Sequence, residues 1–435
     1  MMGIDQVGRV QKKTLTPEER KRRQQANREG VRNLNLYWLA EMVNSGSQLR
    51  EKMAFFWHGH FACRNLNVFY QQELLDVIRR NALGNFGVLL KEVSRTAAML
   101  NFLNNQQNRK GHPNENFARE VMELFTLGRG HYTEDDVKDA ARAFTGWTAN
   151  AKGEFIFRKF QHDDGKKTVL GQTGDFDGAD VLDVLLEQKQ TALFICKKIY
   201  QFFVNDHPDM EKIGFMAERF YKSWYEISGL LEDIFTSEWF YEEKNIGCKI
   251  KSPVELLVGI QRMLPMKIQN EESLIVLQRL LGQMLFYPPN VAGWPGGKSW
   301  IDSSTLMLRL RIPMLINDAD EMNVSPKDDD DQMMGRQKTE PVAAERSRGG
   351  SKANMKMMGK AGRPIEADVD WHDYTKFFES TAREKLINRI AGILLQTKTA
   401  ISPDLVRNYA DQANRENFIK SVTLQMMSTP EYQLC

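Results

Sequence analysis

Two histidines, His58 and His60, flank Gly59 at the end of an aromatic and apolar run. If the chain is extended or kinked at Gly59, side chains two residues apart point the same way and can share a metal ion. On a regular helix the same side chains diverge by about 200°. Imidazole suits Zn, Fe or Cu. The pair therefore indicates either a divalent transition-metal site or two histidines satisfied within the core.

A further candidate ligand is Glu120, in the segment PNENFAREVMEL that starts at Pro113. Its apolar residues predict a helix, with Glu120 on the apolar side. A buried carboxylate needs a charge, a donor or a metal to compensate its desolvation. The alternative is a capped helix with a surface pair between Glu115 and Arg119, which are one turn apart.

The sequence His162-Asp163-Asp164-Gly165 offers a third imidazole. Asp-Gly is a favoured hairpin dipeptide, and Asp163 alone can cap a simple turn. The metal hypothesis unites His162 with the three ligands above, since first-row ions hold nitrogen and oxygen ligands at about 2.0–2.2 Å. It thus requires His58, His60, Glu120 and His162 to converge.

An irregular loop, YPPNVAGWPGG, runs from Tyr287 to Gly297. Its prolines and glycines fix or free the backbone, and such loops often carry binding residues. The candidate binding residues are Asn290, Trp294, Trp300 and Arg119. The alternative is a long connection held to the helices by its tryptophans. The sequence contains no GxSxG, P-loop, GxGxxG or HExxH, so the familiar hydrolase, nucleotide and zincin mechanisms lack support.

Composition limits the class of protein. The chain has 435 residues, of which 42% are hydrophobic and 27% charged, which is typical of globular proteins. A net charge of +2 gives no global attraction to nucleic acid or anionic membrane, so no nucleic-acid partner is expected. The four cysteines are too dispersed for a disulfide framework. We expect no membrane span, and the first residues lack the apolar core of a signal peptide.

The elements that position these residues are mostly helices, because apolar residues recur at three and four positions through most of 32–313. Thr133 and Ser252 are typical helix caps. We predict a mainly α, multi-helical body with one small β-hairpin near 153–170. Four regions are expected. They are a basic and polar N-terminal segment (1–31), a helical core (32–316), a disordered low-complexity insert (317–367) and C-terminal helices that complete the core (368–435).

Several longer motifs carry a family resemblance. They are MAFFWHGHFAC (53–63), HPNENFAREVMELFTLGRGHYTEDDVKDAARAFTGW (112–147), HDDGKKTVLGQTGDFDGADV (162–181), IKSPVELLVG (250–259) and LFYPPNVAGWPGGKSWIDSSTLMLR (285–309). The chain resembles the large bacterial family of unknown function DUF1800. The resemblance implies that relatives often carry an export signal and a further N-terminal helical segment, inside which this sequence begins. It does not imply a reaction.

Two classes of function follow. The first is an interaction or scaffold protein that acts with a protein partner through aromatic loops. The second is a metal-dependent enzyme that uses the histidines with Glu120. The first is favoured slightly, because no complete catalytic constellation can be identified.

Overall fold

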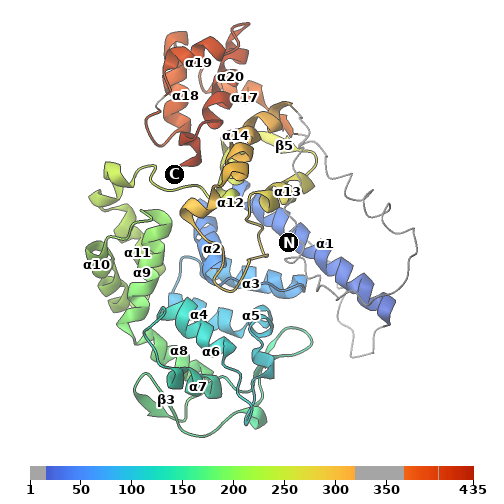
Figure 1. Cartoon of the computed structure of the whole chain (residues 1–435), viewed down its shortest axis with the longest axis vertical. Coiled ribbons are helices and arrows are strands. Elements are labelled where there is room, and N and C mark those ends of the chain that lie inside the picture. Colours follow the sequence, from blue (N-terminus) through green and yellow to red (C-terminus); the bar gives the residue numbers. More distant parts are fainter. Residues whose placement is uncertain (1–15, 319–366, 400) are drawn as a thin grey trace. The chain divides into compact units, whose positions relative to one another are not determined.

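The computed structural model describes residues 16–318, 367–399 and 401–435. It is mainly α-helical with a few two-stranded sheets, which confirms the predicted fold class (Figure 1). The chain divides into two compact units, Met1–Asn245 with Pro288–Trp294, and Ile246–Tyr287 with Pro295–Cys435. This boundary lies inside the 32–316 range for which the sequence predicted one core. Most of the predicted insert (317–367) lies outside the described residues.

The first unit is built mainly from helices. They are α1 (Pro17–Asn44), α2 (Gln48–His60), α3 (Val68–Asn81), α4 (Phe86–Arg95), α5 (Ala97–Phe102), α6 (Asn116–Glu120), α7 (Glu134–Ala143), α8 (Gly178–Leu186), α9 (Lys189–Phe203), α10 (Met210–Lys222) and α11 (Ile227–Phe235). A π-helical turn (Val121–Thr126) continues α6. Short 3-10 turns cover Asn105–Gln107, Lys159–Gln161, Glu238–Tyr241 and Glu243–Asn245.

A buried ion pair joins the first three helices. Glu51 on α2 is almost fully buried and accepts a hydrogen bond from the indole of Trp38 on α1 at 3.1 Å. Arg79 on α3 donates to Glu51 at 2.8 Å and to Glu41 on α1 at 2.9 Å. A buried carboxylate is tolerated when it is paired and hydrogen-bonded in this way. The pair therefore fixes the position of α2, which carries His58 and His60.

The predicted hairpin near 153–170 is replaced by two hairpins. β1 (Trp147–Ala149) pairs with β2 (Phe155–Phe157), and β3 (Lys167–Val169) pairs with β4 (Gln172–Gly174). The predicted hairpin would have paired β2 with β3. Instead, β2 pairs with the strand before it, β1, and β3 pairs with the strand after it, β4.

The turn residues explain the difference. Between β1 and β2, the side chain of Asn150 accepts hydrogen bonds from the backbone of Lys152 and Glu154. Between β3 and β4, Leu170 and Gly171 have φ angles of 50° and 81°, a left-handed pair that closes a tight hairpin. The Asp164–Gly165 dipeptide, which favoured a hairpin in the sequence, lies instead in the loop that follows His162 and is described below.

The predicted caps are confirmed. Thr133 forms a capping box at the start of α7, and Ser252 does the same for α12 (Pro253–Met263).

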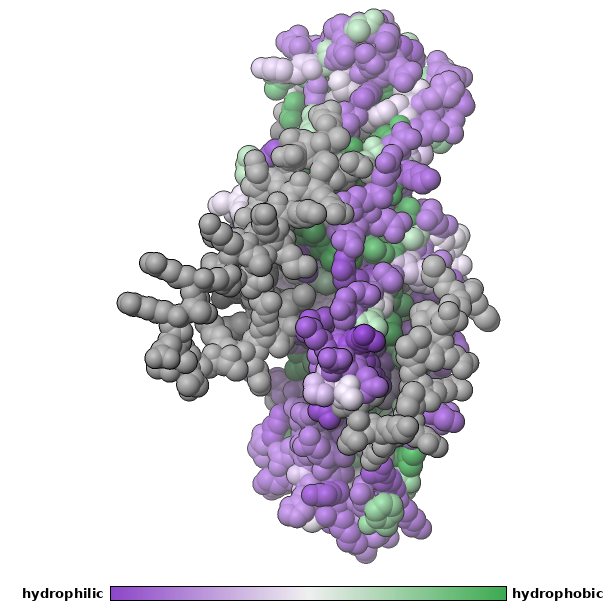
Figure 2. Space-filling view, turned by 90° about the vertical axis from the view of Figure 1, so that its right-hand side faces the viewer, coloured by the Kyte–Doolittle hydropathy of each residue, from purple (hydrophilic) through white to green (hydrophobic). Residues whose placement is uncertain are grey.

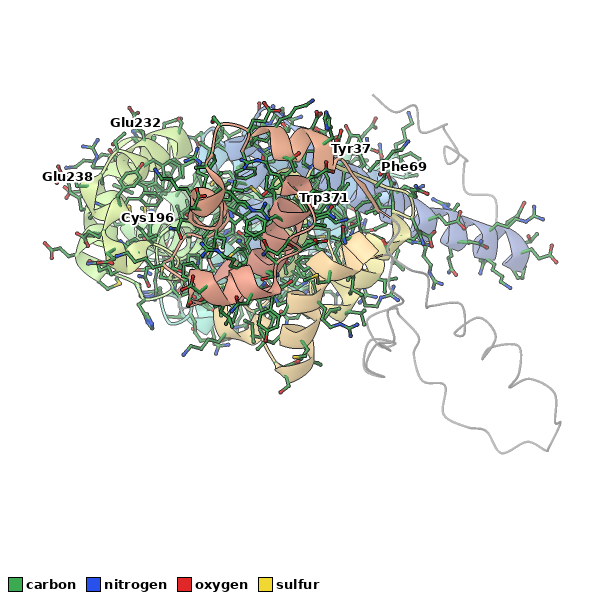
Figure 3. All side chains as sticks on the ribbon, turned by 90° about the horizontal axis from the view of Figure 1, so that it is seen from above. Tyr37, Phe69, Cys196, Glu232, Glu238 and Trp371 are labelled. Atoms are coloured by element: carbon green, nitrogen blue, oxygen red, sulfur yellow. The ribbon has the colours of Figure 1, made fainter. Side chains whose placement is uncertain are left out.

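In the last part of the first unit, α9 packs along α10, and α10 contacts α11. Figure 3 shows Cys196 among the inner side chains of this region, whereas Glu232 and Glu238 point outward.

The second unit combines α12 with the C-terminal helices. Its further helices are α13 (Glu272–Leu280), α14 (Ser303–Asp318), α17 (Trp371–Lys376), α18 (Leu386–Leu394), α19 (Pro403–Tyr409) and α20 (Arg415–Met427). Short 3-10 turns cover Gly297–Trp300, Arg383–Lys385 and Glu431–Gln433. β5 (Met266–Ile268) pairs with β6 (Ala367–Val369). One apolar core includes Ile260, Ile312, Ile390 and Val422. The helices after the insert thus share a core with α12 and α14.

Hydrophilic side chains predominate among the coloured residues on the face shown in Figure 2, with smaller hydrophobic areas between them. No helix of the described ranges is both long and apolar enough to cross a membrane.

Candidate functional site

His58 lies inside an aromatic enclosure. It is buried on α2. Its ring meets that of Trp38 edge-on, with 5.0 Å between the ring centroids, and stacks on that of Trp294, with 5.3 Å between the centroids. Burial lowers the pKa of His58 to about 3, since desolvation disfavours the charged imidazolium. The imidazole is therefore neutral and packs as an aromatic ring.

The 288–294 loop reaches α2 through a close contact of backbones. Gly293 has a φ of 83°, and a Cβ placed there would lie 2.6 Å from the carbonyl oxygen of Gly59. Upstream, the exposed Asn290 accepts a hydrogen bond from the backbone of Ala292 at 2.9 Å, which closes the turn. These contacts bring Trp294 onto His58. The loop for which the sequence predicted the binding residues Asn290 and Trp294 is thus held to α2, which carries His58 and His60.

His60 points elsewhere. α2 continues through His60, so the extended or kinked backbone that a shared metal required does not form, and the two imidazoles diverge. The Nε2 atom of His60 lies 3.1 Å from the carbonyl oxygen of Phe125, and its Nδ1 atom lies 3.1 Å from Nζ of Lys198. Both ring nitrogens are therefore engaged by other groups.

The π-helical turn creates the acceptors that His60 and its neighbours bind. Three side chains bind carbonyl oxygens at the end of this turn. His60 binds the carbonyl oxygen of Phe125, and Lys198 donates to that of Leu124 at 3.3 Å. Gln190 donates to the carbonyl oxygen of Leu127 at 3.0 Å. Carbonyl groups at a helix end lack intrahelical donors. The three side chains thus act together as a cap.

Lys198, on α9, was not identified from the sequence. Burial lowers its pKa to about 8, and burial together with the charge of Lys198 lowers that of His60 well below the usual value. A signal was available, because Lys198 follows the buried Ile195 by three positions and Thr191 by seven, a spacing that places it near the inner face of the helix.

Glu120 ends α6 and is not fully buried. Burial raises its pKa, and the charge of Glu123 adds to that effect. Glu123 accepts hydrogen bonds from Tyr132 and Arg129. No hydrogen bond or ion pair joins the side chain of Glu120 to another described residue.

Arg119 forms the surface pair that the alternative interpretation predicted. It donates to Glu115 at 3.0 Å and to both carboxylate oxygens of Glu134 at 2.8 and 2.7 Å. This clamp ties α6 to the first turn of α7. Its guanidinium is therefore already engaged within the chain.

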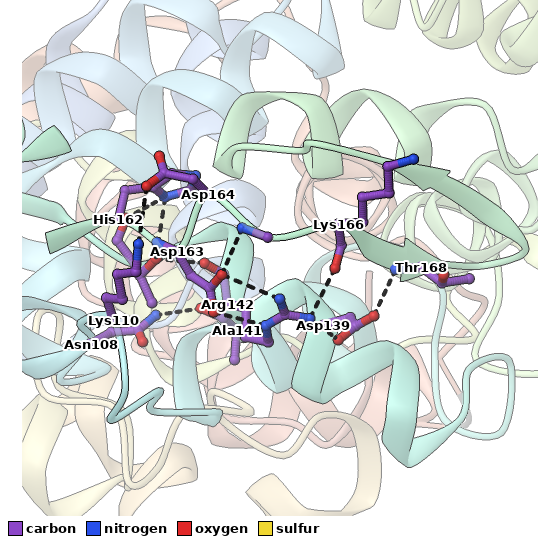
Figure 4. Close-up of polar contacts among 12 residues, drawn as sticks. Asn108, Lys110, Asp139, Ala141, Arg142, His162, Asp163, Asp164, Lys166 and Thr168 are labelled. Atoms are coloured by element: carbon purple, nitrogen blue, oxygen red, sulfur yellow. Dashed lines mark hydrogen bonds and ion pairs between the residues drawn. The ribbon is translucent and has the colours of Figure 1, made fainter. Parts of the chain in front are cut away.

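His162 belongs to a separate polar network (Figure 4). Its Nδ1 atom lies 3.0 Å from the carbonyl oxygen and 3.2 Å from the hydroxyl of Thr145. The same hydroxyl accepts a hydrogen bond from the backbone of Asp163 at 2.8 Å. The ring is thus fixed against the segment that follows α7.

Asp163 anchors the loop after His162. Its carboxylate receives Nε and Nη2 of Arg142 at 2.9 and 3.2 Å, and it accepts the backbone N–H of Gly165 at 2.9 Å. The hydrogen bond from Arg142 is the main cause that lowers the pKa of Asp163 to about 2. Arg142 also binds Asp139 at 2.9 Å. The Asp-Gly sequence therefore forms a turn capped by Asp163, as the simpler interpretation predicted.

Trp300 lies in the second unit, on a short 3-10 turn, and is only 7% exposed. Trp294, by contrast, belongs to the first unit.

Within residues 16–318, 367–399 and 401–435, no three or more His, Cys, Asp or Glu side chains are grouped so that they could hold a metal ion. The sequence-derived ligands instead have separate partners, tryptophans for His58, the π-helical turn and Lys198 for His60, and Thr145 for His162.

Comparisons with known proteins give one match. No curated protein and no solved structure matches the chain significantly. The family model described as protein of unknown function (DUF1800) matches residues 4–434, nearly the whole chain. The chain therefore belongs to the DUF1800 family.

Proposed function

We propose that this helical DUF1800 protein is an interaction protein that binds a protein partner through aromatic turns of its first unit. The observation that supports this most directly is Trp224, in the turn between α10 and α11. Its side chain is 74% exposed. Tryptophan is enriched among the residues that dominate binding energy at protein interfaces.

The backbone of this turn is strained. Trp224 and the buried Tyr225 have φ angles of 53° and 69°, in the left-handed region that bulky residues rarely adopt. Each such residue costs about 1–3 kcal/mol, and strain of this kind clusters at functional sites. The chain therefore keeps a costly conformation at the point where it exposes an indole.

Tertiary hydrogen bonds hold the turn in place. The side chain of Asn85 donates to the carbonyl oxygen of Trp224, and the backbone N–H of Phe86 donates to that of Tyr225 at 2.9 Å. The hydroxyl of Tyr225 donates to the carbonyl oxygen of Leu186 at 2.7 Å. Trp224 is thus presented on a preorganised backbone, which reduces the entropy lost on binding.

The 288–294 loop takes a secondary part in this proposal. It exposes Pro289 and Asn290, while His58 covers one face of Trp294. The partner that fits these features is a protein with an apolar pocket for the indole of Trp224. Asn290 and Trp294 extend the proposed contact.

The proposal can be tested in two stages. A photo-crosslinking amino acid at position 224 in the native host identifies the partner, and the purified partner is then titrated calorimetrically with Trp224→Ala. Because an anchoring tryptophan contributes at least about 1.4 kcal/mol, Kd should rise tenfold or more. Asn290→Ala tests the loop in the same titration.

Phe160 supplies the matched control. Its side chain is 81% exposed, but its backbone has no positive φ. Phe160→Ala should leave Kd unchanged. If Trp224→Ala and Phe160→Ala bind the partner alike, while circular dichroism shows both folded, Trp224 is not an anchor and the proposal fails.

A further inference from the structure

Among the described residues of the second unit, Arg309 has the most deeply buried guanidinium. It lies in the middle of α14 and is 0% exposed. Its Nη1 atom donates to the carbonyl oxygen of Lys251 at 3.0 Å. Its Nε and Nη2 atoms have no hydrogen-bond partner among the described residues. Buried donors are nearly always paired, so this pair of nitrogens calls for an acceptor.

Two other arginines of the chain show what the same two nitrogens bind. Nε and Nη2 of Arg142 hold the carboxylate of Asp163, at 2.9 and 3.2 Å. Those of Arg219 hold the carboxylate of Asp233, at 2.7 and 3.0 Å. This edge of the guanidinium matches the two oxygens of a carboxylate or phosphate. In Arg309 the same edge is buried without such a group from the described residues.

A second buried polar residue, Gln433, binds the backbone of Lys251 through its own backbone carbonyl group. The N–H of Lys251 donates to the carbonyl oxygen of Gln433 at 2.8 Å, so Arg309 and Gln433 both bind Lys251. Gln433 is 1% exposed, and neither its amide nitrogen nor its amide oxygen has a partner among the described residues. Arg309 and Gln433 together therefore leave three buried donor atoms and one buried acceptor unmatched by the described residues.

The charge of Arg309 adds to the need for an anion. Burial lowers its pKa to about 10, and the charge of Glu255 opposes this only in part. The guanidinium thus stays charged at neutral pH. The Glu255 carboxylate caps α12 through the backbone of Ser252 at 2.7 Å. A buried charge without a counter-charge is strongly destabilising.

We propose that Arg309 binds a small oxyanion, a carboxylate or a phosphate, inside the second unit, through Nε and Nη2. The site is independent of the partner surface proposed above. Its ligand is a small molecule or ion, because the guanidinium is enclosed.

The test measures thermal unfolding of the full chain by calorimetry. After dialysis into chloride buffer, sodium phosphate or sodium acetate is added at constant ionic strength, and the two salts distinguish the phosphate and carboxylate sources. One of them should raise the melting temperature of the wild type by about 3 °C or more, since binding to the native state alone stabilises it. Arg309→Met should lose this response.

Two variants serve as controls. Arg219→Met removes an arginine whose edge is already filled, so its response should equal that of the wild type. Arg309→Lys keeps the charge but removes the two-pronged edge, and phosphorus NMR or calorimetric titration should then show affinity at least tenfold weaker. It also keeps the test valid if Arg309→Met does not fold.

Two outcomes would overturn the proposal. If neither anion stabilises the wild type, the edge is satisfied by water. If the Arg309 variants respond as the wild type does, the effect comes from an adventitious ion only.

Discussion

Nζ of Lys198 lies 3.1 Å from Nδ1 of His60 and 3.3 Å from the carbonyl oxygen of Leu124. An ammonium group only donates, so Nδ1 accepts and the proton of the neutral ring is on Nε2, which donates to Phe125. The second histidine of the motif thus completes the backbone hydrogen bonds of the π-helical turn. Its position depends on two segments that are distant from it in sequence, the π-helical turn and α9.

His60→Ala should destabilise the protein strongly. The substitution leaves the carbonyl of Phe125 without its donor, removes a partner of Lys198 and opens a cavity among aromatic rings. We expect a loss of about 2–4 kcal/mol in the free energy of unfolding. Urea denaturation measures it, with the exposed His112→Ala as control. A loss below about 0.5 kcal/mol would mean that His60 is not a cap.

His58 should make stability depend on pH in the acid range. Its pKa is about 3 in the folded chain and 6.5 as a free group, so the unfolded chain binds more protons between these values. Stability therefore falls as pH falls below 6.5. At pH 5 the titration of His58 should have lowered the free energy of unfolding by about 2 kcal/mol relative to its value at pH 7.

His58→Phe should reduce this dependence and leave the part that His60 contributes, because phenylalanine keeps a ring between Trp38 and Trp294 and does not titrate. The comparison is urea denaturation of the two proteins from pH 7 to pH 5. An equal loss in both would show that the imidazole of His58 is protonated in the folded chain.

The sequence was sufficient for local structure. The capping boxes at Thr133 and Ser252 depend on residues three positions apart, and the pair of Arg119 with Glu115 on residues four apart. Such contacts are encoded within one helical turn. They were therefore predicted correctly without any knowledge of the fold.

Distant contacts could not be read in the same way. The helical state of His60 decides whether the two histidines share a direction, and the sequence left this condition open. The division of the hairpins depended on Leu170, a residue with no turn propensity, in the left-handed region. The partners of His60 come from α9 and the π-helical turn, and no spacing connects them to the motif.

The turn after His162 gives a further prediction. A Cβ at Gly165 would lie 2.7 Å from Nη2 of Arg142 and 3.0 Å from the carboxylate of Asp163. Gly165→Ala should therefore push Arg142 from Asp163 and destabilise the chain by about 1–3 kcal/mol.

Gly46→Ala is the control for that substitution, because nothing lies within 4 Å of its Cβ position. Asp163→Asn, made in the wild type and in the Gly165→Ala variant, completes the comparison. If Gly165→Ala acts through the ion pair, its effect should shrink in the Asp163→Asn background. Full additivity would show that Gly165→Ala does not act through this ion pair.

The contact between Gly59 and Gly293 separates the needs of the helix from those of the loop. Gly293 has a φ of 83°, and its Cβ would lie 2.6 Å from backbone, whereas nothing lies within 4 Å of a Cβ at Gly59. Gly293→Ala should thus cost about 2 kcal/mol or more, while Gly59→Ala, inside α2, should stabilise by about 0.5–1 kcal/mol.

The same pair tests whether the loop shields His58. If Gly293→Ala lifts Trp294 from the imidazole, water reaches the ring and its pKa rises from about 3 toward 6.5. NMR titration of the His58 ring measures this shift, and Gly59→Ala should leave the value low. A low pKa in Gly293→Ala, together with unchanged stability, would show that the loop does not enclose His58. A raised pKa in Gly293→Ala alone would show that the 288–294 loop keeps the pKa of His58 low.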